Sequence, residues 1–504
     1  MTTERSISPG DMEMHLEQAS CFPFQCRGRG DNQFGDPTII CSKKLRKNKQ
    51  APSNDATKDD WLISIDNYLD TTDKPQIQRI PSLLREKQSN KNCYDPLVVS
   101  IGPYHHGNPE LEEFEKLKIP IAQKFIRACG NQLPAKQLYE EVVKVGESLR
   151  KCYEKGSTKE YDDESFNKMM FLDACFVLYF ILYICPNTEG TDMKQNDADL
   201  QHRWSYFFVS VRRDLLLLEN QLPLLVLKVL MKFLSKSKGP DLETELIQNF
   251  LDQMPIMTPQ EYSCNNAIEK FLAQMMGCGV QENGEWKTKM NARPRHLLHL
   301  VREELIGSCP DAKNKEKFDK WNSYRSVMEL KSAGIHFRPS QTNRVIDVKF
   351  KSHLFFSTLT LPRITVDDST KDLLLNLAAC EICSYGTDFS IMSYICLMDS
   401  FIDHADDVKE LRKRRILVNH LGSDEELAQL FNKIANGLVF DPSAYEVVKR
   451  QIQNHCESKA QVWMAEWIHY HFSSSWAFLA FLGVIFVIAL TVVQTYFTVF
   501  PHHS

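Results

Sequence analysis

The last apolar segment of the sequence constrains what this chain can fold into more than any other feature. From Trp476 to Val493 the chain runs eighteen residues without a charged side chain, and counting through Phe497 extends the apolar run to twenty-two. At about 1.5 Å per residue, a helix of that length is roughly 33 Å long and matches the ~30 Å hydrocarbon core of a bilayer. Aromatic side chains flank the run, as they do at membrane interfaces. We therefore expect a transmembrane helix over 476–497 and a bilayer contact through Trp476 to Phe497.

The position of this run predicts a tail-anchored, single-pass protein. Only a short tail, 498–504, follows it, so insertion would be post-translational with the body left in the cytosol. The N-terminus has neither the charged start nor the apolar core of a signal peptide. The fifteen cysteines are odd in number and scattered, which favours reduced thiols. We expect a cytosolic body held at the plasma membrane or an endomembrane.

A second apolar run, Met169 to Cys185, needs the same test. It is seventeen residues long and contains one charged residue, Asp173. A central Asp costs roughly 2.5 to 3.5 kcal/mol on insertion scales, and the length is at the lower limit for crossing a bilayer. We therefore expect this run to be a buried helix of the body.

The rest of the chain divides by composition. Residues 1–59 are polar and irregular, which predicts a flexible arm with a basic cluster at 43–49 that could contact anionic lipid, act as a targeting signal or simply be solvated. An α-rich domain is expected over 60–440. Within it, 254–322 is richer in Pro, Gly, Asn and charge and is expected to be an exposed connection. Residues 441–475 are expected to form a juxtamembrane helix.

Helical periodicity dominates the central domain. The expected helices are Glu112 to Ala128, Ala135 to Tyr153, Phe166 to Ile184, Leu200 to Leu234 with a break at Pro223, Thr244 to Gln253, a helix after Asp368, Ile391 to His404, Ala405 to Leu421 and Glu425 to Ile434. Two segments read as strands, Leu97 to Ile101 and the alternating region Val345 to Leu361. The predicted fold class is mainly α: a large helical body with a small β element, plus one C-terminal transmembrane helix.

Several of these segments together resemble a plant family of uncharacterised proteins, the domain-of-unknown-function 247 family, also called uncharacterised protein family 0481. The resemblance rests in the first half on IQRIPSLLRE, YDPLVVSIGPYHHGNPELEEFEKLK, FLDACFVLYFIL and RRDLLLLENQLPLLVL, and in the second on AGIHFRPS, NLAACEICSYG, SIMSYICLMDSFID and DDVKELRKRRILVNHLGSDEELAQLFNKI. It covers about Trp61 to Phe497. The resemblance implies a largely helical plant protein with a C-terminal membrane helix and no established catalytic activity. Some grass members of the family are implicated in self-incompatibility.

The histidine pair of GPYHHG is the first candidate for chemistry, because histidine titrates near neutral pH and binds metals. His105 and His106 are adjacent, so both cannot face one site in a regular element, and no Glu or Cys lies beside them at zinc-ligand spacing. We interpret the segment as a turn shaped by its glycines, with imidazoles bonded to backbone. Cys380 and Cys383 form a C-x-x-C that could be half a metal site or a redox pair, but their apolar neighbours favour core residues.

Two further motifs have structural explanations. Ser423 precedes Glu426 by three residues, the spacing of a helix capping box. The basic run 412–415 could meet lipid headgroups, although Asp406, Asp407 and Glu410 are close enough on the same helix to pair with it. Phosphate-binding loops, dinucleotide fingerprints, H-E-x-x-H and G-x-S-x-G are absent from the sequence. We therefore assign no catalytic, cofactor-binding or metal residue, and no cofactor.

The function predicted from these features is a membrane-tethered plant interaction or recognition protein, not an enzyme, acting in signalling or self-incompatibility-type recognition. It would bind the bilayer and a protein partner whose identity and stoichiometry the sequence does not specify. The formal charge of −5 gives no reason to expect nucleic acid. Two alternatives stay open: an enzyme with an unrecognised site near the GPYHHG turn, and a structural membrane protein that contacts lipid through its basic clusters.

Overall fold

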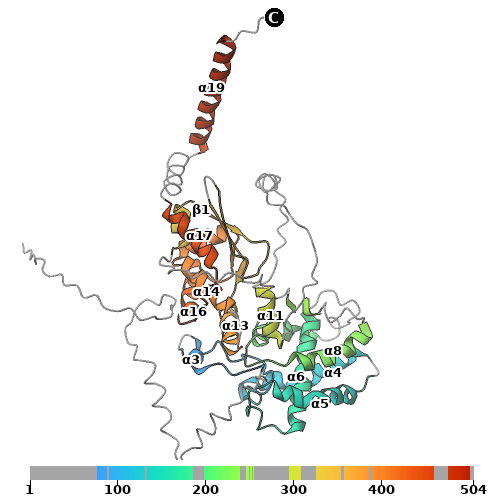
Figure 1. The fold of residues 1–504 in the computed structure, drawn as a ribbon. Helices are drawn as coiled ribbons and strands as arrows, with labels where there is room; N and C mark the ends of the chain where they lie inside the picture. Colours follow the sequence, from blue (N-terminus) through green and yellow to red (C-terminus); the bar gives the residue numbers. More distant parts are fainter. Residues whose placement is uncertain are drawn as a thin grey trace, which may run out of the picture.

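The computed structural model describes twelve stretches of the chain: 76–87, 90–130, 133–184, 198–238, 246–248, 250–251, 254, 295–307, 325–353, 357–384, 389–458 and 475–499. Within them the protein is mainly helical with a few short strands, as predicted (Figure 1). The arm expected over 1–59 lies outside the described residues. Of the helix expected over Thr244 to Gln253, residues 246–248, 250 and 251 are described and are helical, and the other half lies outside.

The first group of helices surrounds one central helix. Their bounds are α3 Ser82–Arg85, η3 Pro109–Leu111, α4 Glu112–Cys129, α5 Ala135–Lys151, α6 Asp163–Ile184, α7 Ala198–Asp214 and α8 Leu224–Lys238. Helices α4, α5 and α8 all pack against α6. Along α6, nearly every side chain from Met169 to Leu182 is buried, because a helix that is apolar all round needs protein on every side. The prediction that Met169 to Cys185 is a buried core helix is confirmed.

The segment between α7 and α8 corrects the expected helix from Leu200 to Leu234. The chain leaves the helix at Asp214, well before Pro223, and resumes it at Leu224. The intervening residues are buried, and their polar side chains bind backbone groups in place of helical hydrogen bonds. Gln221, for example, donates to the carbonyl oxygens of Leu215 and Leu217 at 2.7 and 2.8 Å.

The predicted strand Leu97 to Ile101 is wrong, because side chains take the place of a neighbouring strand. The carboxylate of Asp214 accepts hydrogen bonds from the backbone N–H groups of Leu97, Val98 and Val99 at 2.8 to 3.1 Å. The amide of Asn220 accepts from Ile101 N at 2.7 Å and donates to Val99 O at 3.0 Å. The extended segment therefore has its backbone satisfied without joining a sheet.

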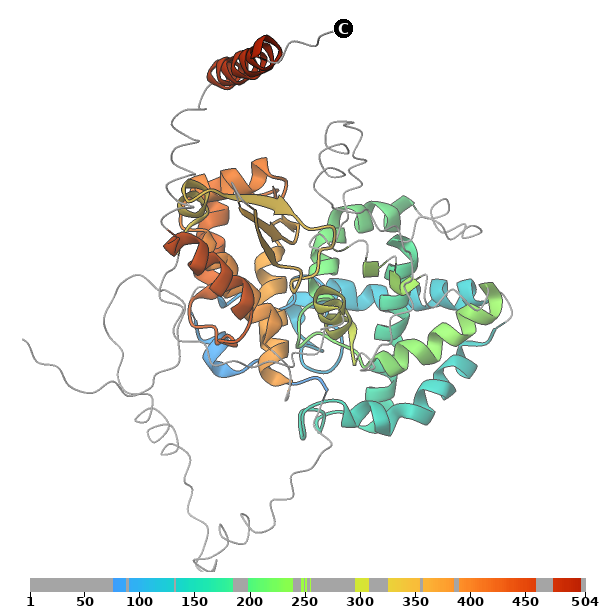
Figure 2. The same ribbon diagram turned by 45° about the horizontal axis from the view of Figure 1, so that its top comes forward.

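The second group of helices lies beside the first, and α3 lies with it (Figure 2). Its members are α11 Leu297–Ile306, α12 Val327–Ser332, α13 Thr370–Cys383, α14 Ser390–Phe401, α15 Ala405–Lys413, α16 Asp424–Ala435 and α17 Glu446–Glu457. Helix α11 corrects part of the exposed connection expected over 254–322. Its Leu298, Val301 and Leu305 are buried in the core, and Arg302 forms a salt bridge with Glu381 of α13 at 3.0 Å.

Two small sheets accompany this group. A three-stranded sheet has the order β1-β3-β2, with bounds β1 Ile335–Pro339, β2 Lys349–Ser352 and β3 Ser357–Leu361. Strands β2 and β3 are antiparallel, which confirms a hairpin inside the predicted region Val345 to Leu361, whereas β1 is parallel to β3 and was not predicted. A second pair joins β4 Ile364–Val366 to β5 Leu417–Asn419. The helix expected over Ala405 to Leu421 therefore ends at Lys413.

The three-stranded sheet has one apolar and one polar face. Phe337, Leu359 and Phe350 are aligned across the strands and buried. Helix α17 covers this side, since the rings of Phe350 and His455 are 5.9 Å apart and His455 Nδ1 lies 3.0 Å from Ser357 Oγ. The alternate positions are exposed on the edge strands β1 and β2, whereas on the middle strand Thr358 is buried and Thr360 is half-buried.

The C-terminal helix α19 spans Ser475–Val499 and includes the run expected to cross a membrane. Its described side chains, from Gly483 to Tyr496, are all exposed. Among the fully described residues, the helix long and apolar enough to span a bilayer is α6, and most of α6 is buried inside the protein. The stretch of α19 whose side chains are described, Gly483–Tyr496, is apolar but shorter than a membrane span requires.

Candidate functional site at the GPYHHG turn

The GPYHHG turn is formed by backbone conformations that glycine adopts easily. Gly102 and Gly107 have φ of 77° and 81°, in the left-handed region. A Cβ atom on Gly102 would lie 2.8 Å from Gln221 O and 3.0 Å from the Tyr153 hydroxyl, so no larger residue fits there. Gly102 N donates to the carboxylate of Asp173 at 2.8 Å. The turn is thus fixed directly to the central helix α6.

His105 faces the carboxylate of Glu219. Its Nε2 lies 3.6 Å from Glu219 Oε2, and that carboxylate also binds Arg85 at 2.7 Å and accepts from Ile80 N at 2.6 Å. Burial lowers the pKa of His105 to about 4, so the imidazole is neutral at pH 7. Burial raises the pKa of Glu219, opposed by Ile80 N–H and Arg85.

His106 faces a different carboxylate. Its Nδ1 lies 3.5 Å from Glu115 Oε1, and its ring meets Tyr161 edge to face with centroids 5.8 Å apart. The other oxygen of Glu115 accepts from Ser100 Oγ at 2.9 Å. The expectation that the imidazoles bond to backbone is therefore wrong, because His105 Nε2 faces Glu219, in the non-helical segment between α7 and α8, and His106 Nδ1 faces Glu115 of α4.

Beneath the turn, a buried lysine links α4 to α6. Lys118 Nζ lies 2.6 Å from Asp173 and 2.6 Å from Glu115, and donates to Ser100 O at 2.7 Å. Lys118 and Asp173 are almost fully buried. The ammonium group of Lys118 thus joins α4 to α6 and to the backbone of Ser100.

These contacts favour a structural role for the turn. Glu219, the natural partner for a catalytic His105, is already bound by Arg85 and Ile80 N. The two histidines do not converge on one point, because one faces Glu219 and the other Glu115. Sequence reasoning missed Glu219 and the neighbouring Asp214. The available signal was Asp214, Glu219, Asn220 and Gln221, which flank and interrupt the leucine-rich part of RRDLLLLENQLPLLVL.

A serine and a histidine do form a pair elsewhere, at the apolar face of the sheet. Ser357 Oγ lies 3.0 Å from His455 Nδ1, and His455 Nε2 lies 2.8 Å from Ala333 O. The carbonyl oxygen can accept only from an N–H at Nε2, so in the neutral imidazole Nδ1 accepts a hydrogen bond from the serine hydroxyl. Ser357 is fully buried, and no substrate could approach it. The pair fixes α17 to the sheet.

The two cysteines of the C-x-x-C motif lie in the core, as predicted. Cys380 and Cys383 of α13 are both free thiols and both buried. Burial raises their pKa to about 11 and about 12, respectively, which keeps them protonated and unreactive at neutral pH. Within the residues that the structure describes, no cluster of three or more His, Cys, Asp or Glu side chains could hold a metal ion.

The remaining motifs also make structural contacts. Ser423 Oγ accepts from Glu426 N at 3.1 Å, which confirms the helix cap. In the basic run, Arg414 pairs with Glu410 at 3.0 Å as predicted, but Arg412 binds Asp424 of α16 at 2.8 Å and not an acid of its own helix.

These features define a mainly helical protein whose sequence motifs are joined by buried polar contacts between distant segments. The chain belongs to the family described as plant protein of unknown function, DUF247, whose model matches residues 77–490. It is 29% identical to UPF0481 protein At3g47200 of Arabidopsis thaliana over 433 residues, covering 81% of this chain and 83% of that protein. It is 24% identical to the putative UPF0481 protein At3g02645 of the same plant over 519 residues, covering 87% of this chain and 94% of that protein. No solved structure matches.

Proposed function

We propose that this protein is a membrane-tethered interaction protein, in which α19 anchors the chain and the helical body presents a binding surface. The observation that carries the proposal is α19 itself, a helix of 25 residues without a charged side chain. At 1.5 Å per residue it is roughly 37 Å long, enough to cross a ~30 Å hydrocarbon core with some tilt. Its described side chains are exposed, as lipid-facing side chains would be in the absence of lipid.

The contacts of the body support a role in binding and not in catalysis. Asp214 and Glu219 of RRDLLLLENQLPLLVL accept hydrogen bonds from backbone N–H groups, and Gly102 N of GPYHHG donates to Asp173. A buried polar group that is already hydrogen-bonded contributes to structure and is not available to bind a substrate. We therefore assign these contacts to the maintenance of the fold, and recognition to the exposed surface. Signalling and self-incompatibility-type recognition are roles that such a tethered surface could serve, with the body in the cytosol.

A second candidate function is an enzyme at the GPYHHG turn. One observation favours it: His105 Nε2 is buried without a hydrogen-bond partner, 3.6 Å from a carboxylate. Changing His105 and His106 together to Asn tests this reading. If catalysis is the function, the plant phenotype disappears while thermal stability is unchanged; if the turn is structural, as we propose, stability falls.

The experiment that tests the anchor is a topology assay. A glycosylation acceptor tag is added after Ser504, the full chain is expressed with microsomes, and protease is added from outside. A glycosylated tail with a digested body supports the proposal. An unmodified tail with a protected body would reverse the topology and place the body on the lumenal side. Release of the whole chain by alkaline carbonate would overturn the proposal.

A further inference from the structure

The outward face of the three-stranded sheet is basic. Strand register places His336 beside Thr358 and Lys351, and Arg338 beside Thr360 and Lys349. His336, Arg338, Lys349 and Lys351 are all exposed, while the alternate residues on these strands are mostly buried. We call these four side chains the basic sheet face. The threonines between them on β3 are short, so the long basic side chains of both edge strands project beyond the middle of the sheet.

Positive charge continues past the β1 edge. Partial burial lowers the pKa of His336, the nearby charges of Arg414, Arg338 and Lys331 lower it further, and Glu410 opposes them. Two carboxylates lie in this region: Glu410, bound by Lys331 and Arg414, and Asp347, bound by Lys349. Counted over these described side chains, five lysines and arginines stand against two carboxylates, so positive charge predominates among them.

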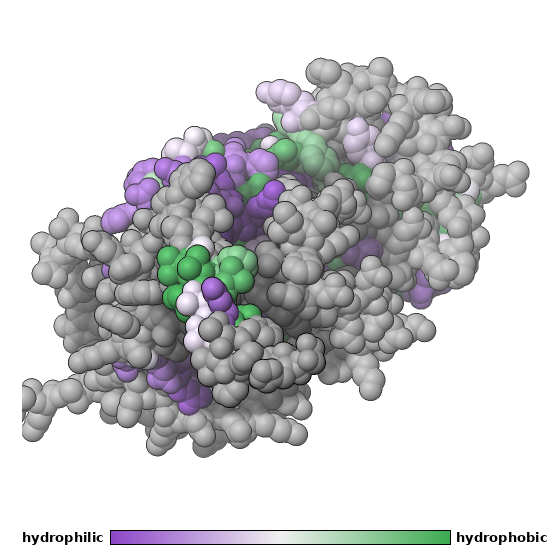
Figure 3. All heavy atoms as spheres, turned by 90° about the horizontal axis from the view of Figure 1, so that it is seen from above, coloured by the Kyte–Doolittle hydropathy of each residue, from purple (hydrophilic) through white to green (hydrophobic). Residues whose placement is uncertain are grey.

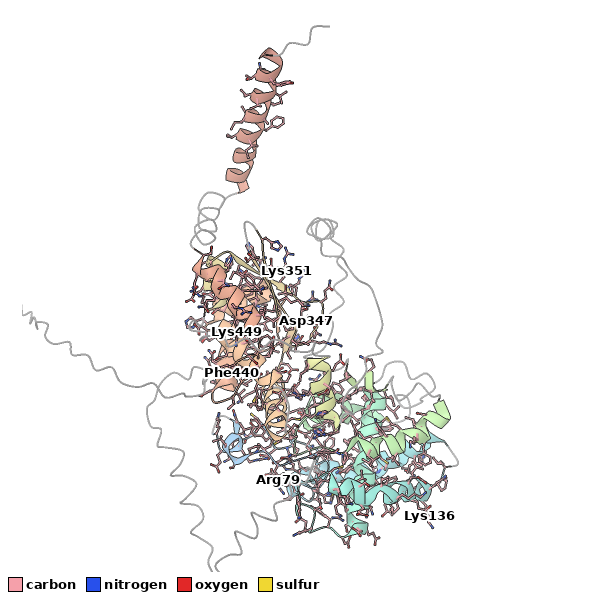
Figure 4. The ribbon with its side chains drawn as sticks, viewed as in Figure 1. Arg79, Lys136, Asp347, Lys351, Phe440 and Lys449 are labelled. Carbon is pink, nitrogen blue, oxygen red and sulfur yellow. The ribbon has the colours of Figure 1, made fainter. Side chains whose placement is uncertain are left out.

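The basic sheet face lies at the end of the body from which the chain continues to α19. His455, near the end of α17, contacts Ser357 and Ala333, which lie at the same end of the sheet as Lys351 and His336. Only residues 458–474 separate α17 from α19, a reach of at most roughly 60 Å. Figure 4 shows Lys351 at this end and Lys136 at the far end of the body. Viewed from above, hydrophilic side chains lie on the face of the body turned toward α19, which is itself seen end-on as a compact hydrophobic group (Figure 3).

We propose that the basic sheet face docks on the anionic phospholipid headgroups of the membrane that α19 enters, so that the body is held against the bilayer in one orientation. This inference rests on the proposed anchoring by α19. Each Lys or Arg near an anionic surface contributes about a fivefold preference for the docked state. The attraction extends about one Debye length, ~8 Å at physiological salt, so the tether is needed to keep the face within range.

Charge and connection favour lipid over a soluble polyanion. The whole chain carries a formal charge of −5, so a free polyanion would meet net repulsion, while a tethered patch meets the membrane at high local concentration. The patch is also small, whereas a nucleic-acid surface usually extends over a whole domain. The occupant that fits is a planar anionic surface already present beside the anchor.

Lysine acetylation in nanodiscs tests the inference on the full chain. The protein is reconstituted in nanodiscs of phosphatidylcholine alone or with a third phosphatidylserine, and the acetylation rate of each lysine is measured by mass spectrometry. Phosphatidylserine is expected to lower the acetylation rates of Lys349 and Lys351 at least fivefold, and 0.5 M NaCl is expected to restore these rates. Lys136 and Lys144, exposed on α5, serve as internal references whose rates stay equal in both lipids.

A matched pair of variants completes the test. Arg338→Ser removes one charge of the basic sheet face without touching either reporter lysine, and is expected to reduce their protection about fivefold. Lys136→Ser removes one charge at the far end and is expected to change nothing.

The outcomes separate the two proposals. If the chain is not retained by nanodiscs of either composition, anchoring by α19 fails. If it is retained by both and Lys349 and Lys351 react equally in the two lipids, docking of the basic sheet face is overturned. If polyglutamate or RNA added to phosphatidylcholine nanodiscs slows these lysines as phosphatidylserine does, lipid is overturned as the occupant.

Discussion

Helices α6 and α19 are similar in length and each contains a long apolar run, yet the first is buried and the second is exposed. In α6, Phe176 and Phe180 are fully buried under α4, α5 and α8. In α19, Phe486 is 64% exposed and every described neighbour is exposed as well. The same kind of segment is therefore a core helix in one place and a candidate membrane span in the other.

The difference can be traced to one charged residue and its partner. Helix α6 contains Asp173, whose carboxylate pairs with Lys118 and accepts a hydrogen bond from Gly102 N. These contacts hold α6 at one position inside the body. Helix α19 contains no charged residue, and its Thr491 and Thr495 hydroxyls donate to carbonyl oxygens one turn earlier in the helix, at 2.8 and 2.7 Å. A helix with its polar groups satisfied internally needs no protein partner, which suits a bilayer. Apolar length alone does not separate the two.

The largest expected effect is the loss of membrane insertion by α19. Replacing Ile485 and Ile488 with Lys puts two charges in the middle of the helix and opposes insertion by about 5 to 7 kcal/mol, since each central Lys costs roughly 2.5 to 3.5. We expect the chain to move from the carbonate-resistant membrane fraction to the soluble fraction. The thermal transition of the body should not change, because these side chains pack on nothing in the described structure.

The matched control replaces both residues with Leu, which keeps the apolar surface and should keep the chain in the membrane fraction. A double-Lys variant that still resists carbonate would mean that α19 is not the anchor. Loss of thermal stability in that variant would mean that α19 packs on the body.

The next largest effect is the loss of folding stability when the buried ion pair of α6 is removed. Lys118→Met leaves the Asp173 carboxylate buried and unpaired, which costs about 3 to 5 kcal/mol. We expect a lower urea midpoint with the same dependence on urea concentration. Adding Asp173→Asn to Lys118→Met removes the unpaired buried charge and keeps an acceptor for Gly102 N. The double variant should therefore recover part of the lost free energy of unfolding.

A matched surface variant is Lys116→Met, since Lys116 is exposed on the same helix and pairs with Glu112 in solvent. Its change should be below about 1 kcal/mol. Equal losses in Lys116→Met and Lys118→Met would show that the buried pair does not hold α6 in place.

The sequence predicts elements whose contacts are local. The core helix α6, the Ser423 cap of α16 and the β2–β3 hairpin follow from periodicity and short spacing, and the structure contains them. Strand β1 was missed because its partner β3 is joined to it in parallel, and the pairing cannot be read from either segment alone. Strand β5 was read as helix for the same reason, since its partner β4 lies about fifty residues earlier.

The candidate site shows the same limit in its side chains. The turn at GPYHHG was predicted from its glycines, because the required φ is a local property. The carboxylates that face its histidines were not, since Glu219 lies 114 positions from His105 and nothing near GPYHHG indicates it. The polar residues Asp214, Glu219 and Asn220 stand out in an apolar segment, which signals buried contacts without naming their partners.

The third prediction uses pH to sharpen the buried side of the comparison. His105 has its pKa lowered by burial from 6.5 to about 4, so the unfolded chain binds a proton in this range that the folded chain does not. Stability is therefore unaffected above about pH 6.5, falls as the pH drops toward 4, and changes no further below it. The loss attributable to His105 approaches about 3 kcal/mol at pH 4.

The measurement is the free energy of unfolding from urea titrations between pH 4 and pH 8, for the natural chain and for His105→Asn. His296 and His299 are also held neutral by burial and contribute to both chains. Only the difference between the two curves reports His105. Parallel curves over this range would mean that the His105 imidazole is solvated, and that the turn does not pack as described.

The smallest expected effect is the loss of a helix cap on α16, which is neither central nor apolar and serves as a reference for α6. Ser423 caps α16 by accepting from Glu426 N, so Ser423→Ala should cost about 1 kcal/mol. Ser423→Asn keeps a hydrogen-bond acceptor at the cap, so its cost in free energy of unfolding should be only a small fraction of that of Ser423→Ala. Both values come from urea titration at pH 7. A loss as large as that of Lys118→Met would mean that the second helical group is as sensitive as α6, and that the buried pair is not what distinguishes α6 from the other helices of the body.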